Sequence, residues 1–319
     1  SPPLITGLSG VQIPPGPPKD MQKPVLKSYI LLFILSAIWG SAFFNYKIVL
    51  NSFDFYLLAG GRILFASIFL YFLSLIFVKT INFKILISRK FYIFFLIGFT
   101  NYVLPFCLIA FGIEGMTSGL AALLMSAGPF YAIFLSHFFS NDKFNRYKFL
   151  GTVIGFISVF ILFYDQVYIS KTTTIFSVLI VMSASLSYVI GGLIIQKYRE
   201  YNNETIATLS MICGTIILLP ICILKLSELD FDQVEMTSVL SLIYLGIVST
   251  AIAFMIRAKL IFENGLIFMS QVSLLIPIFG LYFSWLFLSE QFSVNMFVSL
   301  IIILFGLWVL QIGYKKINS

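Results

Sequence analysis

Residues 91–112 read FYIFFLIGFTNYVLPFCLIAFG, and this stretch contains no Asp, Glu, Lys or Arg. About 20 apolar residues are enough for a helix to cross the hydrocarbon core of a bilayer. The stretch also lacks the regular alternation of polar and apolar residues that marks a strand. It therefore predicts a membrane-spanning helix.

The composition of the whole chain agrees with this stretch. Of its 319 residues, 60% are hydrophobic and only 10% are charged, whereas soluble domains carry about 45–50% apolar and about 25% charged residues. A chain of this composition has too few charged residues to cover a water-facing surface. The composition therefore excludes a soluble enzyme, a nucleic-acid-binding protein and a disordered protein. The predicted fold class is an all-α membrane protein.

Ten apolar runs are long enough to cross a hydrocarbon core of about 30 Å as helices. They cover residues 28–50, 54–78, 91–112, 115–140, 147–165, 174–197, 204–225, 237–260, 264–289 and 293–314. An even number of crossings places both termini on one side of the membrane. Residues 1–20 hold six of the eleven prolines and no sustained apolar run. We expect them to form a disordered leader, an added tag or a short cytoplasmic tail.

The basic residues give the orientation. If the N-terminus is cytoplasmic, sixteen of the twenty Lys and Arg residues lie on the cytoplasmic side, and the external loops hold only Lys171 and Lys225. This asymmetry follows the positive-inside rule, so both termini are predicted to be cytoplasmic. It also accounts for the net charge of +7 without a nucleic-acid partner. The Ile-, Phe-, Lys- and Asn-rich composition is typical of an AT-rich bacterial genome, and the predicted location is the bacterial cytoplasmic (inner) membrane.

The ten runs divide into two repeats of five, residues 28–165 and 174–314. An offset of 148 positions (246 − 98) aligns the chain with itself without a gap. The aligned pairs are Gly98 with Gly246, Phe106 with Phe254, Pro129 with Pro277, Ser136 with Ser284, Asp142 with Glu290, and Phe144 with Phe292. Because each repeat has an odd number of helices, the two copies must be inverted. Inverted repeats around a central cavity are the architecture of secondary transporters.

Short motifs add a family resemblance. In chain order they are Trp39-Gly40-Ser41, Lys47, Arg62, the Gly119–Ala122 stretch before Pro129, then Pro277 and Leu288-Ser289-Glu290. Together with the ten spans and the repeat, they make residues 28–314 similar to the EamA-like members of the drug/metabolite transporter superfamily. The resemblance implies a ten-helix inverted-repeat bundle whose central cavity is lined mainly by the first, third, fourth, sixth, eighth and ninth helices. One departure is Asn141-Asp142, where the family usually shows Glu followed by a basic residue.

Polar, aromatic and proline residues within the spans are the candidates for substrate contact. They are Trp39, Asn45, Asn101, Tyr102, Ser126, Pro129, Tyr188, Ser249, Thr250, Gln271, Ser273 and Pro277. An amide without a partner is costly in hydrocarbon, so Asn101 and Gln271, both near mid-span, are expected to face the bundle interior. Packing and interhelical hydrogen bonds are the alternative roles of the same residues.

Four ionisable residues are candidates for charge or coupling roles: Lys47, Arg62, Glu114 and His137. Lys47 and Arg62 lie in the outer third of the membrane. They either attract a substrate carboxylate or phosphate, or act as a snorkelling lysine and a structural Arg62–Asp54 pair. All thirteen acids lie in loops or at span ends, so facilitated diffusion or exchange is favoured over proton antiport.

The predicted function is a secondary transporter of small polar or amphipathic metabolites. The family resemblance implies amino acids as the substrate class and export as the direction. Two alternatives are an exchanger or importer of a nucleoside-type metabolite such as S-adenosylmethionine, and a non-transporting membrane sensor. An enzyme is not expected, because one histidine and no mid-span acid do not make a catalytic cluster. Neither a cofactor nor a metal is expected, and ten helices can enclose a cavity as a monomer or weak dimer.

Overall fold

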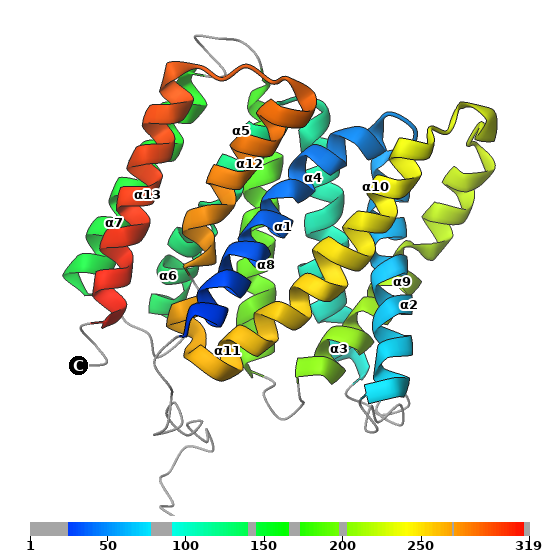
Figure 1. The fold of residues 1–319 in the computed structure, drawn as a ribbon, viewed down its shortest axis with the longest axis horizontal. Helices are drawn as coiled ribbons and strands as arrows, with labels where there is room; N and C mark the ends of the chain where they lie inside the picture. The colour runs from blue at the N-terminus through cyan, green and yellow to red at the C-terminus, as the bar shows by residue number, and fades with distance from the viewer. Residues whose placement is uncertain are drawn as a thin grey trace, which may run out of the picture.

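The structure, a computed structural model, describes residues 25–77, 91–139, 145–165, 173–197, 203–269 and 271–315. Within these ranges the regular elements are helices, and none is a strand. The helices stand side by side in one bundle (Figure 1). The predicted all-α fold is therefore confirmed. The predicted leader, residues 1–20, lies outside the described residues.

The first half of the chain supplies eight elements. They are α1 (Leu26–Leu50), α2 (Phe55–Phe77), α3 (Phe91–Gly98), the π-helix η2 (Phe99–Val103), α4 (Leu104–Glu114), α5 (Ser118–Met125), α6 (Gly128–Phe139) and α7 (Arg146–Tyr164). The α3, η2 and α4 segments follow each other without a break. They form the single span that the quoted stretch predicts.

The second half follows the same plan. Its elements are α8 (Ile175–Lys197), α9 (Asn203–Ser227), the short 3-10 helix η4 (Phe231–Gln233), α10 (Met236–Gly246), the π-helix η5 (Ile247–Ile252), α11 (Ala253–Met269), α12 (Val272–Leu288) and α13 (Val294–Lys315). Among the described residues, nine helical stretches are long and apolar enough to cross a membrane. The remaining predicted span, 264–289, contains α12, which is apolar but shorter, at 17 residues.

The predicted break between residues 260 and 264 is wrong. The structure continues α11 without interruption to Met269, and α12 begins only at Val272. Lys259 and Glu263 stand four residues apart on this helix, with their charged groups 3.8 Å apart. An i,i+4 pair of this kind supports a helix across the expected loop. The ninth span therefore starts later than the sequence predicts.

The predicted span 115–140 is two helices, with a turn at Ser126 and Ala127 between α5 and α6. Pro129 causes the break, because proline has no N–H to donate to the carbonyl four residues earlier. That carbonyl belongs to Met125, and the hydroxyl of Ser185 in α8 donates to it instead, at 3.4 Å. A neighbouring helix thus satisfies the backbone group that the proline leaves open.

Three pairs of elements begin 148 positions apart: α2 and α9, η2 and η5, and α7 and α13. The close contacts between the halves repeat as well. Gly98 lies against the carbonyl oxygen of Ser210 in α9, and Gly246 lies against the carbonyl oxygen of Arg62 in α2. Ser210 and Arg62 are themselves equivalent positions (210 − 62). The internal duplication predicted from sequence is therefore visible in both the elements and their packing.

The largest apolar core lies where α1, α4, α5 and α8 meet. Its fully buried members include Tyr46, Ile113, Leu120 and Val181. The α7 and α13 helices pack against each other at one side of the bundle (Figure 1). The α2 and α9 helices pack against each other at the other side. The candidate site lies where α2 meets α1, α4 and η5.

Candidate functional site: a buried arginine cluster

Arg62 is a buried cation near the start of α2. It lies about 10 Å from Phe55 along the helix axis, since each helical residue advances about 1.5 Å. The residue is 6% exposed. Its Nε–H donates to Thr250 Oγ1 at 2.8 Å, and its Nη1 donates to the Tyr46 hydroxyl at 2.6 Å. Two hydroxyls, one from α1 and one from η5, therefore hold the guanidinium.

Aromatic rings surround the same guanidinium. Its central carbon lies 4.0 Å from the centre of the Phe106 ring and 5.3 Å from that of Tyr46. The rings of Tyr102 and Tyr188 lie 6.1 and 6.4 Å from Phe106. Ring faces attract cations, so this arrangement stabilises a positive charge. The Arg62 cluster is defined as Arg62, Tyr46, Thr250, Phe106, Tyr102 and Tyr188.

The charge of Arg62 is not balanced by a described acid. Within the described part of the chain, no carboxylate lies within 4 Å of its nitrogens. The expected Arg62–Asp54 pair does not form, because Asp54 Oδ1 instead accepts the Leu57 N–H at 2.7 Å at the start of α2. An unpaired cation inside a membrane bundle is costly, which makes it a candidate functional residue.

The two π-helices supply polar groups in mid-bundle. The Thr250 hydroxyl in η5 accepts from Arg62 and donates to the Leu245 carbonyl at 2.8 Å, five residues back. In η2, the Thr100 carbonyl accepts from Ser187 in α8 at 2.8 Å. Short π segments inside α-helices are frequent at functional sites. Here they also carry three predicted substrate residues, Asn101, Tyr102 and Ser249, besides Thr250.

The other polar candidates bond to nearby backbone. Four side chains donate to carbonyls: Asn45 to Ser41, Asn101 to Ile97, Ser126 to Leu123 and Ser249 to Ile38. Asn101 also packs on Gly191 of α8 and so faces a neighbouring helix. These residues lie between helices, where each has a protein partner in this conformation.

The remaining apolar candidates are separated in space. Trp39 is half-buried and packs on the cluster that includes Leu35 and Ala253. Pro129 lies at the start of α6, and Pro277 is buried inside α12. The structure therefore does not bring Trp39 or the two prolines into the Arg62 cluster, whereas it does place Tyr102, Tyr188 and Thr250 there.

Gln271 lies at the beginning of α12, not near mid-span as expected. It immediately precedes the helix, with Ser273 half-buried in the first turn. The cause is the continuation of α11 to Met269, which moves the start of the ninth span. Gln271 lines a pocket of about 320 Å³ together with Tyr29, Leu32, Phe33, Leu274 and Leu275.

Lys47 and Glu114 lie at the end of the bundle where α1 and α4 end and α2 begins. Lys47, half-buried in the last turn of α1, interacts electrostatically with Glu290 and with the exposed Glu114. Glu290 accepts the backbone N–H groups of Ser118 and Gly119 at 2.8 and 3.1 Å, and the Ser118 hydroxyl at 3.0 Å. It thereby ties the end of α12 to the first turn of α5. The side chain of His137 lies outside the described part of the structure.

The sequence interpretation missed two members of the Arg62 cluster, Tyr46 and Phe106, as site residues. Phe106 stood in the repeat alignment and one helical turn after Tyr102, which was a usable signal. Tyr46 lies between the candidates Asn45 and Lys47, and nothing in its own spacing marks it. Only the contact between α1 and α2 identifies it.

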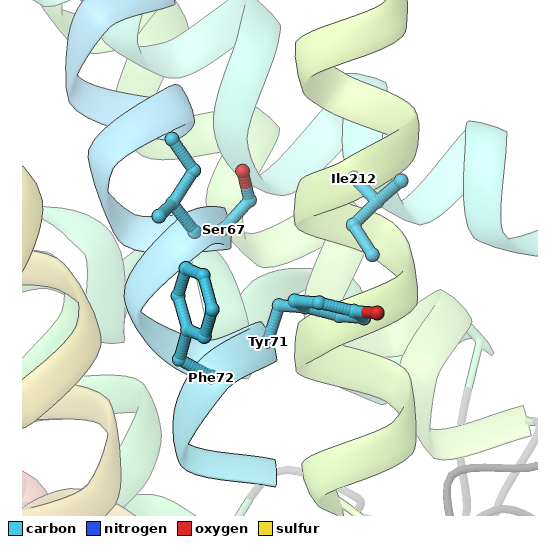
Figure 2. Close-up of a pocket in the computed structure, with 5 residues that line it drawn as sticks. Ser67, Tyr71, Phe72 and Ile212 are labelled. Atoms are coloured by element: carbon cyan, nitrogen blue, oxygen red, sulfur yellow. The ribbon is translucent and has the colours of Figure 1, made fainter. Parts of the chain in front are cut away.

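The described pockets lie at the perimeter of the bundle. One of about 180 Å³ lies between α2 and α9. Figure 2 shows Ser67, Tyr71, Phe72 and Ile212 around it. Tyr71 and Phe72 are exposed side chains, as are Tyr29 and Phe33 of the pocket at Gln271. The Arg62 cluster is filled by its own side chains in this conformation, since Tyr46 and Thr250 are only 1% and 5% exposed.

These features define a polytopic membrane protein made of two five-span repeats. The chain belongs to the EamA-like transporter family, which matches it over residues 26–164 and 175–312. The two matched segments coincide with the two repeats. The protein is therefore a multi-pass membrane transporter of this family.

Comparisons with individual proteins agree. The chain is 24% identical to the "Probable amino-acid metabolite efflux pump" of Escherichia coli (strain K12), over 91% of this chain and 96% of that protein. It is 22% identical to the "Uncharacterized transporter YoaV" of Bacillus subtilis (strain 168), over 90% of this chain and 98% of that protein. A solved crystal structure matches with a TM-score of 0.65 at 12% identity, covering 92% of this chain and 99% of its own, which supports the fold.

Proposed function

We propose that the protein exports amino acids or related small amphipathic metabolites across the bacterial cytoplasmic membrane by alternating access. In this proposal both termini are cytoplasmic, and the active form is a monomer or weak dimer. The family membership supports transport, and the name of the Escherichia coli relative supports the substrate class.

The observation that carries the mechanism is the duplicated contact between the halves. Gly98 of the first repeat meets α9, and its equivalent Gly246 of the second repeat meets α2 in the same way. When two inverted copies share one interface, exchanging their conformations converts an inward-facing state into an outward-facing one. The filled Arg62 cluster then belongs to a closed state between the two.

The chemistry of the cluster fits an amphipathic zwitterion. Arg62 supplies positive charge, the hydroxyls of Tyr46 and Thr250 supply polar contacts, and Phe106 and Tyr188 supply apolar surface. Substrate sites usually combine mostly apolar walls with a few placed polar groups. The described acids are at helix ends or connections except for Glu263 in α11, so exchange or facilitated diffusion is the expected mode.

Counterflow in proteoliposomes tests this proposal. Vesicles are preloaded with a pool of unlabelled amino acids or a pool of nucleosides, and uptake of a labelled member of the same pool is followed without an ion gradient. Transient accumulation with the amino-acid pool is the expected result. Accumulation with the nucleoside pool alone would support the alternative substrate class.

Protein-free vesicles and vesicles with heat-inactivated protein serve as controls. Stabilisation of the folded protein by amino acids without any flux would support the sensor alternative. No flux and no stabilisation with either pool, from protein that is monodisperse in detergent, would contradict the amino-acid assignment.

A further inference from the structure

The buried guanidinium of Arg62 has N–H donors that make no hydrogen bond to a described residue. A guanidinium carries five N–H donors in a planar fork that matches a carboxylate. The two hydrogen bonds to described residues use one donor of Nε and one of Nη1. Both acceptors are neutral hydroxyls, which orient the group without neutralising its charge.

Helix packing does not require an arginine at this position. Ser210 is the repeat equivalent of Arg62, and its backbone makes the equivalent close contact with Gly98. Ser210 is completely buried, and its hydroxyl has no hydrogen-bond partner among the described residues. The same interface is therefore built once around a serine and once around an arginine. A cation has been placed where a small residue is sufficient for packing.

The surroundings of Arg62 fit an anion that arrives and leaves. Tyr46 belongs to the first repeat and Thr250 to the second, so the guanidinium bridges the two repeats, whose conformations exchange in the proposed transport cycle. The Phe106 face at 4.0 Å restrains the plane of the guanidinium. A permanent acidic partner would instead occupy the fork in every state.

From these observations we infer that Arg62 binds the carboxylate of the transported amino acid. Tyr46 and Thr250 act as positioning residues that fix the guanidinium for it. This inference rests on the proposed function, and it narrows the substrate class to solutes with a free carboxylate. Arg62 then provides the same recognition for different side chains.

Two pools in the counterflow assay test this inference. One contains free amino acids, and the other contains the same amino acids as their carboxamides, which keep the amine and the side chain. Wild-type protein should exchange the free acids at least about tenfold faster at low concentration, because hydrogen bonds to a charged group change affinity by about tenfold to a hundredfold. Arg62→Gln should reduce this preference to less than about twofold, whereas Arg62→Lys should retain the preference with a raised KM.

Arg257 offers a matched control. It lies 5.3 Å from the ring centre of Phe254, the repeat equivalent of Phe106, so it is also a cation over an aromatic face in the bundle. Arg257→Gln should leave the ratio between the two pools unchanged. If Arg62→Gln does not fold, Thr250→Val combined with Tyr46→Phe tests the same point and should raise KM for the free acids only.

The outcomes separate the inference from the proposed function. Flux of neither pool by folded wild-type protein overturns the amino-acid proposal itself, and this inference with it. Equal flux of both pools leaves the transporter proposal in place and overturns the role of Arg62. The role of Arg62 is also overturned if the preference for free amino acids over carboxamides persists in Arg62→Gln protein. The same holds if that preference is lost in Arg257→Gln protein instead.

Discussion

Ser67 in α2 and Thr215 in α9 are equivalent positions of the two repeats, and their hydroxyl oxygens lie 3.3 Å apart. A residue can meet its own equivalent only beside the axis that relates the two copies. In Figure 1 the two helices lie side by side and run in opposite directions. The axis that relates them therefore lies across the helices and not parallel to them. That is the geometry expected of an inverted repeat, with its axis in the membrane plane.

A cross-link between these positions tests that axis. In a background where the three cysteines are replaced by serine, Ser67→Cys with Thr215→Cys should form a disulfide on mild oxidation, because the two side chains already touch. Loss of both thiols to a maleimide probe after oxidation measures the reaction. Pairing Ser67→Cys with Ser227→Cys at the exposed end of α9 is the control and should leave both thiols reactive.

The duplicated glycine contacts should be intolerant of any side chain. A Cβ at Gly246 would stand 2.5 Å from the Cβ of Phe65 and 3.0 Å from the Arg62 carbonyl oxygen, so Gly246→Ala must push α10 away from α2. Overpacking of this kind costs about 1–3 kcal/mol. A lower melting temperature and a smaller yield of monodisperse protein in detergent are expected.

Gly192 in α8 is the matched control for this substitution. A Cβ there meets nothing within 4 Å. Gly192→Ala should therefore keep or raise the melting temperature, since alanine is favoured over glycine inside a helix by about 1 kcal/mol. Equal effects of the two substitutions would contradict the close contact between α10 and α2.

Glu290 should stabilise the contact between the end of α12 and the first turn of α5. Its carboxylate accepts two backbone N–H groups in the first turn of α5, where a helix attracts negative charge. Glu290→Ala leaves these donors without their partner and should cost about 1–3 kcal/mol. The measurement is the melting temperature, together with the reactivity of a cysteine introduced at Ser118 in a cysteine-free background.

The control is Glu235→Ala at the start of α10, where the acid makes no capping bond to the backbone. It should change the melting temperature little. Unchanged stability and unchanged reactivity at position 118 in Glu290→Ala protein would contradict the role of Glu290 in holding α12 against α5.

The fold was predictable because lipid makes strict demands on composition. Uncharged runs such as 91–112 must become helices, and the offset between Gly98 and Gly246 is a property of the sequence itself. The site was less predictable. A π-helix adds a residue to a turn, so the faces of α4 and α11 are rotated relative to a regular helix. The contact of Arg62 with Thr250 and Phe106 depends on that rotation, and no regular spacing could predict it.

The positions at which helices begin and end also depend on tertiary contacts. The predicted break between residues 260 and 264 falls next to Asn264 and Gly265, yet the structure forms helix there. Conversely, the break before Pro129 needed a partner for the free Met125 carbonyl. That partner, Ser185, lies in the other repeat, where local sequence cannot identify it.

The hydrogen bond from the Ser185 hydroxyl to the Met125 carbonyl should stabilise the protein only because Pro129 is present. In wild-type protein, Ser185→Ala leaves the Met125 carbonyl unpaired and should cost about 0.5–1.5 kcal/mol. In a Pro129→Ala background, residue 129 regains an N–H that can donate to the same carbonyl. Ser185→Ala should then cost little. A double-mutant cycle of melting temperatures in detergent measures the difference, and additive effects of the two substitutions would show that Ser185 does not compensate for the proline.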